Sequence, residues 1–464
     1  MDLSLQQILF ILITGASIFW AVRQYRKIFS NIMLGESEPI TGDKGERWNR
    51  TILFALGQKK MFKKWLPAVL HGFIYVAFLF TQIELIEIFI DGIFGVHRFF
   101  AGKIGFLYPL IINFIEILSL GAFVATIIFL WRRNVIKLPR FEKAEMIGWP
   151  QKDANLILLG EIVLIIGIFT MNGADVVLQS IDPTHYPDTG PLLISDHLGP
   201  ALFGGLAEGS LHFFERTGWW LHLFVVLAFL NYLPVSKHLH IFLAFPNAWF
   251  SRLKPRGQMD EMPVITNEVR SMMGLEVSSE MSGEGESDEL PEFGAHDVTE
   301  LSRLDILGAY ACTECGRCTA VCPANLTGKK LSPRKIMMDI RDRAEEVGEL
   351  IRTGDEKYIK PEMKKDGVKL SRDNFSDGKS LFDRISKEEI HACTTCQACV
   401  EACPVLINPL EPILKLRRYE ILTESAGPAE WVPMFTAMEN NGAVWQVNED
   451  RETWARDFEN EKNG

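Results

Sequence analysis

Cysteine is scarce in this chain and is confined to one region. The 464 residues contain eight cysteines, all of them between Cys312 and Cys403. A secreted disulfide scaffold is therefore excluded, because such scaffolds are short and soluble and this chain is neither. A basic face is also lacking. The net charge is −11, so no nucleic-acid partner is expected.

The eight cysteines repeat one spacing twice, C-x2-C-x2-C-x3-C-P. This is the ligand pattern of a protein with two 4Fe-4S clusters, in which the fourth cysteine of each run binds the other cluster. A pair of zinc sites, the alternative, leaves the third cysteine and the x3-C-P unexplained. We predict one cluster on Cys312, Cys315, Cys318 and Cys403, and the other on Cys393, Cys396, Cys399 and Cys322.

Five apolar stretches in the first half are long enough to cross a bilayer, which takes about 20 residues. They run roughly from Leu3 to Val22, Leu66 to Ile90, Phe106 to Trp131, Ala154 to Leu178 and Trp219 to Phe242. The first is expected to be an uncleaved anchor, because Asp2 and not a basic stretch precedes it.

The distribution of Lys and Arg predicts the orientation of these spans. Ten lie between the first two spans and six between the third and fourth, whereas the opposite loops hold only Arg98, Lys103 and Arg216. The N-terminus is therefore expected outside the inner membrane, and everything after the fifth span in the cytoplasm. A reducing compartment also suits thiolate-bound clusters.

An acidic segment separates the two halves. Between Gly257 and Glu300 there are twelve acidic residues and one basic residue. We predict an all-α protein in three parts: a five-helix transmembrane bundle at 1–250, a flexible linker at 251–297 and an α-helical ferredoxin domain with two clusters at 298–464. In the last part we expect helices from Ser332-Pro333 through Val347 and from Pro412 to Leu422, and an insertion with little core between Asp355 and Ser380.

Three histidines are candidate haem ligands. His71 follows Lys64 by seven residues and so lies roughly 10 Å inside the second span. His222 and His240 are eighteen residues apart, which on a continuous helix is about five turns and about 27 Å. His71 and His240 are both expected near the cytoplasmic side, where they could hold a haem iron between facing helices. The alternative is an interfacial His240 and a His71 that hydrogen-bonds a neighbouring helix.

Other polar residues of the first half have two interpretations. Intramembrane acids can take up protons from a quinol, or they can reach the interface and bond to neighbouring helices. These acids are Glu84, Glu87, Glu116, Glu161 and Asp175. The remaining outer histidines, His97, His185, His197 and His212, are expected to be solvated.

The first half resembles the gamma subunit of respiratory nitrate reductase, a di-haem cytochrome b. The resemblance lies in the five spans, in Leu70-His71-Gly72 and in the stretch from Tyr232 to His240. It implies haem b on His71 and His240. It also matches His222 to a ligand of an outer haem, but Thr81 stands near the position of the expected partner, so a second haem has no visible second ligand.

The second half, roughly from Val298 to Phe458, is similar to the electron-transfer subunit of heterodisulfide reductases. The match is carried by Ala311–Cys318, His391–Pro404 and Leu416-Arg417-Arg418. In longer relatives a cysteine-rich region with paired CCG motifs holds the catalytic site. No cysteine follows Cys403 here, so the resemblance implies a separate cytoplasmic catalytic subunit such as a CCG-motif protein.

Together these patterns predict a membrane-anchored electron-transfer subunit without an evident substrate site of its own. It would link quinone or quinol in the lipid bilayer, through haem b and two 4Fe-4S clusters, to the cytoplasmic catalytic subunit. Two alternatives remain open. One is a complete membrane oxidoreductase acting on a disulfide or small organic acid, and the other is a membrane redox sensor.

Overall fold

A computed structural model describes residues 4–255, 257–259, 261–276, 293–444 and 452–463. Within these ranges the chain is helical, and extended pairing is limited to two isolated bridges, Glu36 with Ser302 and Ile359 with Phe375. The chain forms two compact units, one of residues 1–262 and 297–413, the other of residues 263–296 and 414–464. The predicted three-part division stays a prediction.

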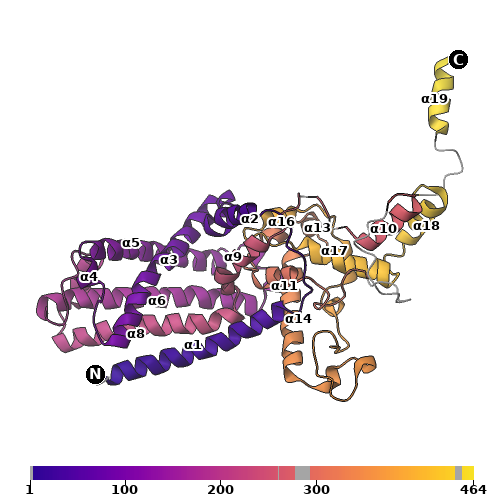
Figure 1. The fold of residues 1–464 in the computed structure, drawn as a ribbon. Coiled ribbons are helices and arrows are strands. Elements are labelled where there is room, and N and C mark those ends of the chain that lie inside the picture. Colours follow the sequence, from indigo (N-terminus) through magenta and orange to yellow (C-terminus); the bar gives the residue numbers. More distant parts are fainter. Residues whose placement is uncertain (1–3, 256, 260, 277–292, 445–451, 464) are drawn as a thin grey trace. The chain divides into compact units, whose positions relative to one another are not determined.

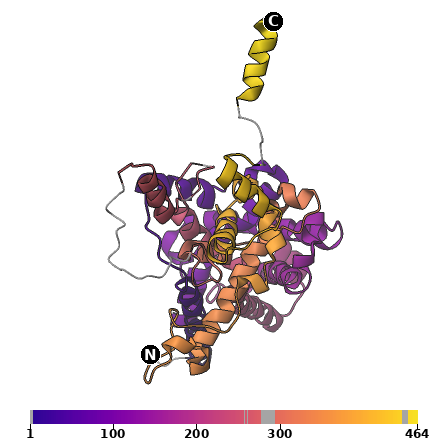
Figure 2. The ribbon, with the colours of Figure 1, turned by 90° about the vertical axis from the view of Figure 1, so that its right-hand side faces the viewer.

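Five helices of the first unit are long and apolar enough to cross a membrane, as predicted. They lie side by side in Figure 1 and are seen nearly end-on in Figure 2. They are α1 (Leu5–Ile32), α3 (Trp65–Phe94), α5 (Leu107–Asn134), α6 (Trp149–Ile181) and α8 (Glu208–Tyr232). Shorter helices between them are α2 (Lys44–Arg50), α4 (Ala101–Ile104) and α7 (Ser195–Phe203), and α9 (His240–Phe250) follows the fifth span.

The backbones of α6 and α8 approach each other closely because glycines face the contact. A Cβ added to Gly218 would lie 2.5 Å from the backbone nitrogen of Met171, and one added to Gly167 would lie 3.2 Å from that of His222. Small residues allow such close packing between helices in a membrane, where apolar burial alone does not drive association.

The fifth span differs from its prediction. It begins at Glu208, not Trp219, and the helix ends at Tyr232. Two 3-10 turns follow, Leu233–Val235 and Lys237–Leu239, with the extended residue Ser236 between them. Pro234 has no N–H to continue the helical hydrogen bonds. His222 and His240 therefore lie on two different helices, and the expectation of one continuous helix is wrong.

The first unit continues with the cysteine-bearing segment, which is built from short helices around one long helix. They are α11 (Arg303–Tyr310), α12 (Arg317–Ala320), α13 (Pro323–Leu326), α14 (Pro333–Thr353), α15 (Lys387–His391), α16 (Ala398–Ala402) and the start of α17 (Leu410–Arg418). The predicted helix after Ser332 is confirmed. Ser332 caps α14 by accepting a hydrogen bond from the backbone N–H of Lys335, and Pro333 occupies the first turn.

Helix α1 contacts both the bundle and the cysteine-bearing segment. It packs against α3 and α8, and also against α11 and α14. Near its end, the buried side chain of Asn31 donates to the Tyr310 hydroxyl (2.8 Å) and accepts from Arg352 (2.7 Å). These contacts join the first span to two helices more than 270 residues later in the chain.

The second unit contains α10 (Pro263–Met272), α18 (Trp431–Asn441) and α19 (Thr453–Asn463), and α17 enters it at Leu414. A π-helical turn, Tyr419–Thr423, follows α17. Residues 277–292 of the predicted linker, which hold half of the twelve acidic residues of this segment, lie outside the described residues.

The insertion between Asp355 and Ser380 is attached to α14 by a buried cation. Arg343 is only 1% exposed and binds both carboxyl oxygens of Asp297, both of Asp377 and the carbonyl of Lys379. Next to it, hydrogen bonds from Lys379 hold the pKa of Glu346 at about 2. Because this folded-state pKa is depressed, Glu346 adds stability above its ordinary range, and that stability is lost as pH falls towards about 2.

We predict that Arg343→Met releases this insertion. Removing one partner of a buried ion pair typically costs about 3–5 kcal/mol, since Asp297 and Asp377 lose their cation. Hydrogen exchange of residues 355–380 should become faster, and the unfolding midpoint in urea should fall. The control is Lys357→Met, because Lys357 is exposed and its described contacts are with its sequence neighbours Asp355 and Tyr358. Equal effects of the two substitutions would contradict the anchoring role of Arg343.

Candidate functional site

The two cysteine segments have the same backbone course. Glu314 and Thr395, each between the first and second cysteine, have φ values of 52° and 55°. Gly316 and Gln397, each after the second cysteine, have φ values of 70° and 60° and directly precede α12 and α16. The sequence repeat is therefore also a repeat of the local fold.

The fourth cysteine of each segment lies beside the opposite segment. Burial and, to a lesser extent, the neighbouring Cys315 together raise the pKa of Cys403 to about 11. Burial likewise raises the pKa of Cys399 to about 12, with added contributions from Cys393 and from Cys322. Helices α12 and α16 pack against each other and bring the segments together. This arrangement supports the predicted crossed pairing of the ligands.

The donor set suits iron–sulfur clusters. Eight thiols gather in two groups of four, which we call the first group (Cys312, Cys315, Cys318, Cys403) and the second group (Cys393, Cys396, Cys399, Cys322). Burial raises the pKa of Cys312 to about 12, so this thiol is protonated until it binds metal. Iron binds the thiolate and so displaces these protons.

The two groups differ in exposure. Cys312 and Cys403 of the first group are buried, and Cys315 and Cys318 are partly buried. In the second group Cys396 is exposed. The second group is therefore the one that reaches the protein surface.

A buried carboxylate ties the first group to the membrane half. Glu314 lies between Cys312 and Cys315 and is 3% exposed. It accepts hydrogen bonds from Lys237, which follows the fifth span, and from Arg341 of α14 (2.8 Å). Although burial raises the pKa of Glu314, these two cations hold it below its ordinary value. The corresponding residue of the second segment, Thr395, bonds to the carbonyl of its neighbour Thr394.

Two arginines make further contacts with the loops of the membrane half. Arg317 donates to the carbonyl of Lys60, just before the second span. Arg334 is fully buried and donates to the Glu145 carboxylate (2.7 Å) and to the carbonyl of Arg140, both in the loop between the third and fourth spans. The first group is thus attached to the ends of several spanning helices.

A hydrogen bond at Nδ1 orients the ring of His71, and another at Nδ1 orients the ring of His240. Nδ1 of His71 lies 3.0 Å from Oε1 of Gln58, and Nδ1 of His240 lies 3.0 Å from the carbonyl of Lys237. Such a bond fixes the tautomer and leaves Nε2 for a metal. An added Cβ at Gly72, next to His71, would meet no atom within 4 Å. These features would fit a haem held by His71 and His240.

His238 lies beside this pair. Its ring centroid is 5.8 Å from that of His240. Burial and, to a lesser extent, the neighbouring His240 and His71 together lower the pKa of His238 to about 3. Among the described residues, its Nδ1 has no hydrogen-bond partner. His238 therefore lacks the orienting bond that His71 and His240 have.

His222 lies apart from these three histidines, on α8. It is 2% exposed, and its Nδ1 has no partner within the described part of the chain. Thr81, at the position where a second ligand was sought, donates its hydroxyl proton to the carbonyl of Phe78 in its own helix. The structure therefore does not supply a partner ligand for His222 at this position.

Sequence reasoning missed the residues that connect the two halves. The side chains of Gln58, Lys237, Glu314 and Arg317 bear on the site through partners 13 or more positions away. One signal was present for Glu314, because the two cysteine segments are near copies and differ there in charge, with Thr395 in the second.

Comparison with known proteins agrees with the iron–sulfur assignment. Residues 311–407 match the family described as "4Fe-4S dicluster domain". No solved structure matches the chain.

Three relatives are similar to this chain. The "Probable iron-sulfur-binding oxidoreductase FadF" of Bacillus subtilis is 27% identical over 96% of the chain and 60% of its own length. The "EtfAB:quinone oxidoreductase" of Syntrophomonas wolfei is 23% identical over 85% of the chain and 52% of its own length. The "Probable membrane-anchored ferredoxin" of Chromohalobacter salexigens is 32% identical over 36% of the chain and 24% of its own length.

The chain thus spans about half to three fifths of the length of the first two relatives. With its five apolar helices and its dicluster segment, it is a membrane protein similar to iron–sulfur oxidoreductases, and electron transfer by membrane-anchored iron–sulfur clusters is supported.

Proposed function

We propose that this chain conducts electrons between quinone in the bilayer and a redox protein in the cytoplasm. Haem b, held by His71 and His240, and two 4Fe-4S clusters, held by the crossed cysteine groups, supply one-electron chemistry when bound. The single observation that carries the proposal is the ion pair of Glu314 with Lys237, which joins the first cysteine loop to the turn that orients His240.

The order of the centres follows from the contacts of the protein. Lys237 binds Glu314 of the first group with its side chain and His240 with its carbonyl. Arg317, also in the first segment, donates to Lys60 near the start of the span that carries His71. The first group therefore faces the two histidines, and the second group, with the exposed Cys396, is the point of exchange with a soluble partner.

The printed names of the relatives favour quinone at one end and a soluble redox protein at the other. One relative is called an EtfAB:quinone oxidoreductase. The soluble partner in this proposal is EtfAB or a heterodisulfide reductase-like catalytic protein. It is not part of residues 1–464, and it would exchange electrons with the second group at Cys396. The basic loops before the second and fourth spans favour a cytoplasmic location for the second group. Electrons could flow in either direction, since the same centres serve quinol oxidation and quinone reduction.

Purified full-length protein tests the proposal as a whole. About eight cluster irons, at least one haem b and reduction of the haem by a reduced soluble naphthoquinone are expected. Clusters without haem would contradict the haem assignment. Clusters with haem but without response to the naphthoquinol would contradict the quinone assignment.

The crossed pairing predicts which cysteine variants behave alike. Cys403→Ser should remove the same cluster EPR signal as Cys315→Ser, because both thiols belong to the first group. Cys322→Ser should instead resemble Cys399→Ser. Each variant should lose up to about four irons. If Cys403→Ser matched Cys399→Ser and not Cys315→Ser, each run would hold its own cluster and the crossing would be wrong.

The haem assignment predicts a distinct result for each of the clustered histidines. His71→Ala and His240→Ala should each lose the haem, measured as the pyridine haemochrome spectrum. His238→Ala is the matched control, because its ring lies 5.8 Å from that of His240 but lacks the orienting bond. Gln58→Ala should weaken haem retention by about 10- to 100-fold, as for other residues that orient metal ligands. Haem loss in His238→Ala with retention in His240→Ala would reverse the assignment.

A further inference from the structure

A buried cluster of carboxyl groups lies at the end of the bundle far from the cysteines. Glu84, Glu87 and Asp91 project from the second half of α3, and Asp175 from α6. All four are at most 8% exposed. Glu84 follows His71 by thirteen residues, which is about 20 Å along the helix.

Positive charge in this cluster is scarcer than negative charge. The guanidinium of Arg98, 5% exposed, lies 3.7 Å from Glu84, 4.0 Å from Glu87 and 3.3 Å from Asp175. Even with His97 protonated, the four carboxyl groups outnumber the cations in contact with them among the described residues. An unpaired carboxylate at this depth is costly, so the cluster must hold at least one proton.

Glu84 is the residue best placed to hold that proton. Within the described ranges, neither of its carboxyl oxygens accepts a hydrogen bond of ordinary length, although it is 1% exposed, and its polar neighbours are the amide of Asn172 and the guanidinium of Arg98. Glu87, in contrast, accepts from the Tyr108 hydroxyl (2.7 Å) and the backbone N–H of Phe100 (2.8 Å). Asp91 accepts two backbone N–H groups, those of Arg98 and Phe99. Bonds of this kind stabilise the charged form of a carboxyl group.

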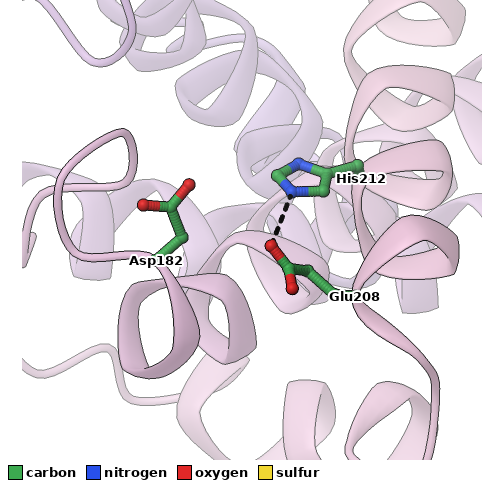
Figure 3. A group of neighbouring side chains, drawn as sticks. All are labelled: Asp182, Glu208 and His212. Atoms are coloured by element: carbon green, nitrogen blue, oxygen red, sulfur yellow. Dashed lines mark ion pairs between the residues drawn. The ribbon is translucent and has the colours of Figure 1, made fainter.

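Titratable groups continue from this cluster towards the outer surface. Asp175 binds Nε2 of His97 (2.8 Å), and His97 is 18% exposed, so the expectation that His97 is simply solvated is wrong. The ring of His97 packs on Tyr186, whose hydroxyl lies 3.0 Å from Nδ1 of His212. His212 in turn lies 3.7 Å from Glu208, and Figure 3 shows this ion pair with Asp182 nearby. The side chain of Glu208 is 59% exposed.

Helices α5 and α8, which contact α3, also contribute titratable groups to this region. They are Tyr108 and Glu116 of α5, and Glu215, Arg216 and His222 of α8. Glu116 accepts hydrogen bonds from Ser195 and the backbone N–H of Ile194, and Glu215 pairs with Arg216. These two carboxylates therefore have close partners, whereas the nearest cation to Glu84 is Arg98 at 3.7 Å.

We propose that Glu84, Asp175 and His97 form a proton relay between a quinone in the bundle and the surface opposite the cysteine groups. Conversion of a quinol to a quinone breaks two O–H bonds and releases two electrons and two protons. The electrons leave towards His71 and His240, and Glu84 takes up the protons one at a time. Arg98 keeps its charge and positions the carboxyl groups, and its 3.7 Å distance to Glu84 suits a bridging water. The relay rests on the proposed quinone function and runs in reverse for quinone reduction.

An infrared experiment on the full chain tests the relay without requiring quinone activity. The carbonyl band of protonated carboxyl groups should lose one component in Glu84→Gln, and Glu161→Gln, an intramembrane acid of α6, should retain that component. After transfer to D2O the component should shift, and the shift should slow by at least about tenfold in His97→Gln. Retention of the component in Glu84→Gln, or an unchanged exchange rate in His97→Gln, would overturn the relay.

A kinetic experiment connects the relay to quinone. Reduction of the metal centres by the reduced naphthoquinone should slow by about 10²-fold in Glu84→Gln and stay unchanged in Glu161→Gln, a size typical of lost general acid–base catalysis. Dithionite should reduce all three proteins to the same end point, which shows that the variant folds and keeps its centres. An unchanged quinol rate in Glu84→Gln would overturn the relay. A wild-type protein unresponsive to quinol would overturn the proposed function, and the infrared result would still decide whether Glu84 exchanges protons through His97.

Discussion

The arrangement of the redox half depends on one buried charge, the carboxylate of Glu314. A carboxylate that is 3% exposed must be paired, and its two cations come from different parts of the chain. Lys237 follows the fifth span and Arg341 belongs to α14. The requirement to satisfy this one group therefore fixes a cysteine loop, a long helix and the end of a spanning helix together. Because Lys237 also orients His240, the two candidate cofactor sites are positioned by the same interaction.

Much of the fold could be predicted because its signals are local. Five apolar stretches gave five long helices, and Ser332-Pro333 marked the start of α14. The fifth span was the least accurate prediction. Its first turns carry Glu208, His212 and Glu215, which find polar partners: His212 contacts Tyr186 and Glu208, and Glu215 pairs with Arg216. The helix then ends at Tyr232, shortly before Pro234, although the sequence stays apolar beyond that point.

In the candidate site, too, local features could be predicted from the sequence and long-range contacts could not. Cysteine spacing identifies the ligands because cluster loops are local structures. The ion pairs of Glu314 with Lys237 and of Arg98 with Asp175 each join residues 77 positions apart, and neither spacing nor hydropathy reports such pairs. The sequence identified the intramembrane acids but not the contacts of Arg98 with three of them, because Arg98 was expected to lie in a loop between two spans.

The contacts of α1 constrain how the protein is made. This helix leaves the ribosome before the other four spans, yet Asn31 near its end is satisfied by Tyr310 and Arg352, and Lys27 pairs with Glu349. These partners are synthesised only after the fifth span. The end of α1 therefore waits at the membrane surface until the cysteine-bearing segment is made, and that segment completes its packing. Maturation of the metal centres and final packing of the membrane bundle are consequently coupled late steps of one assembly process.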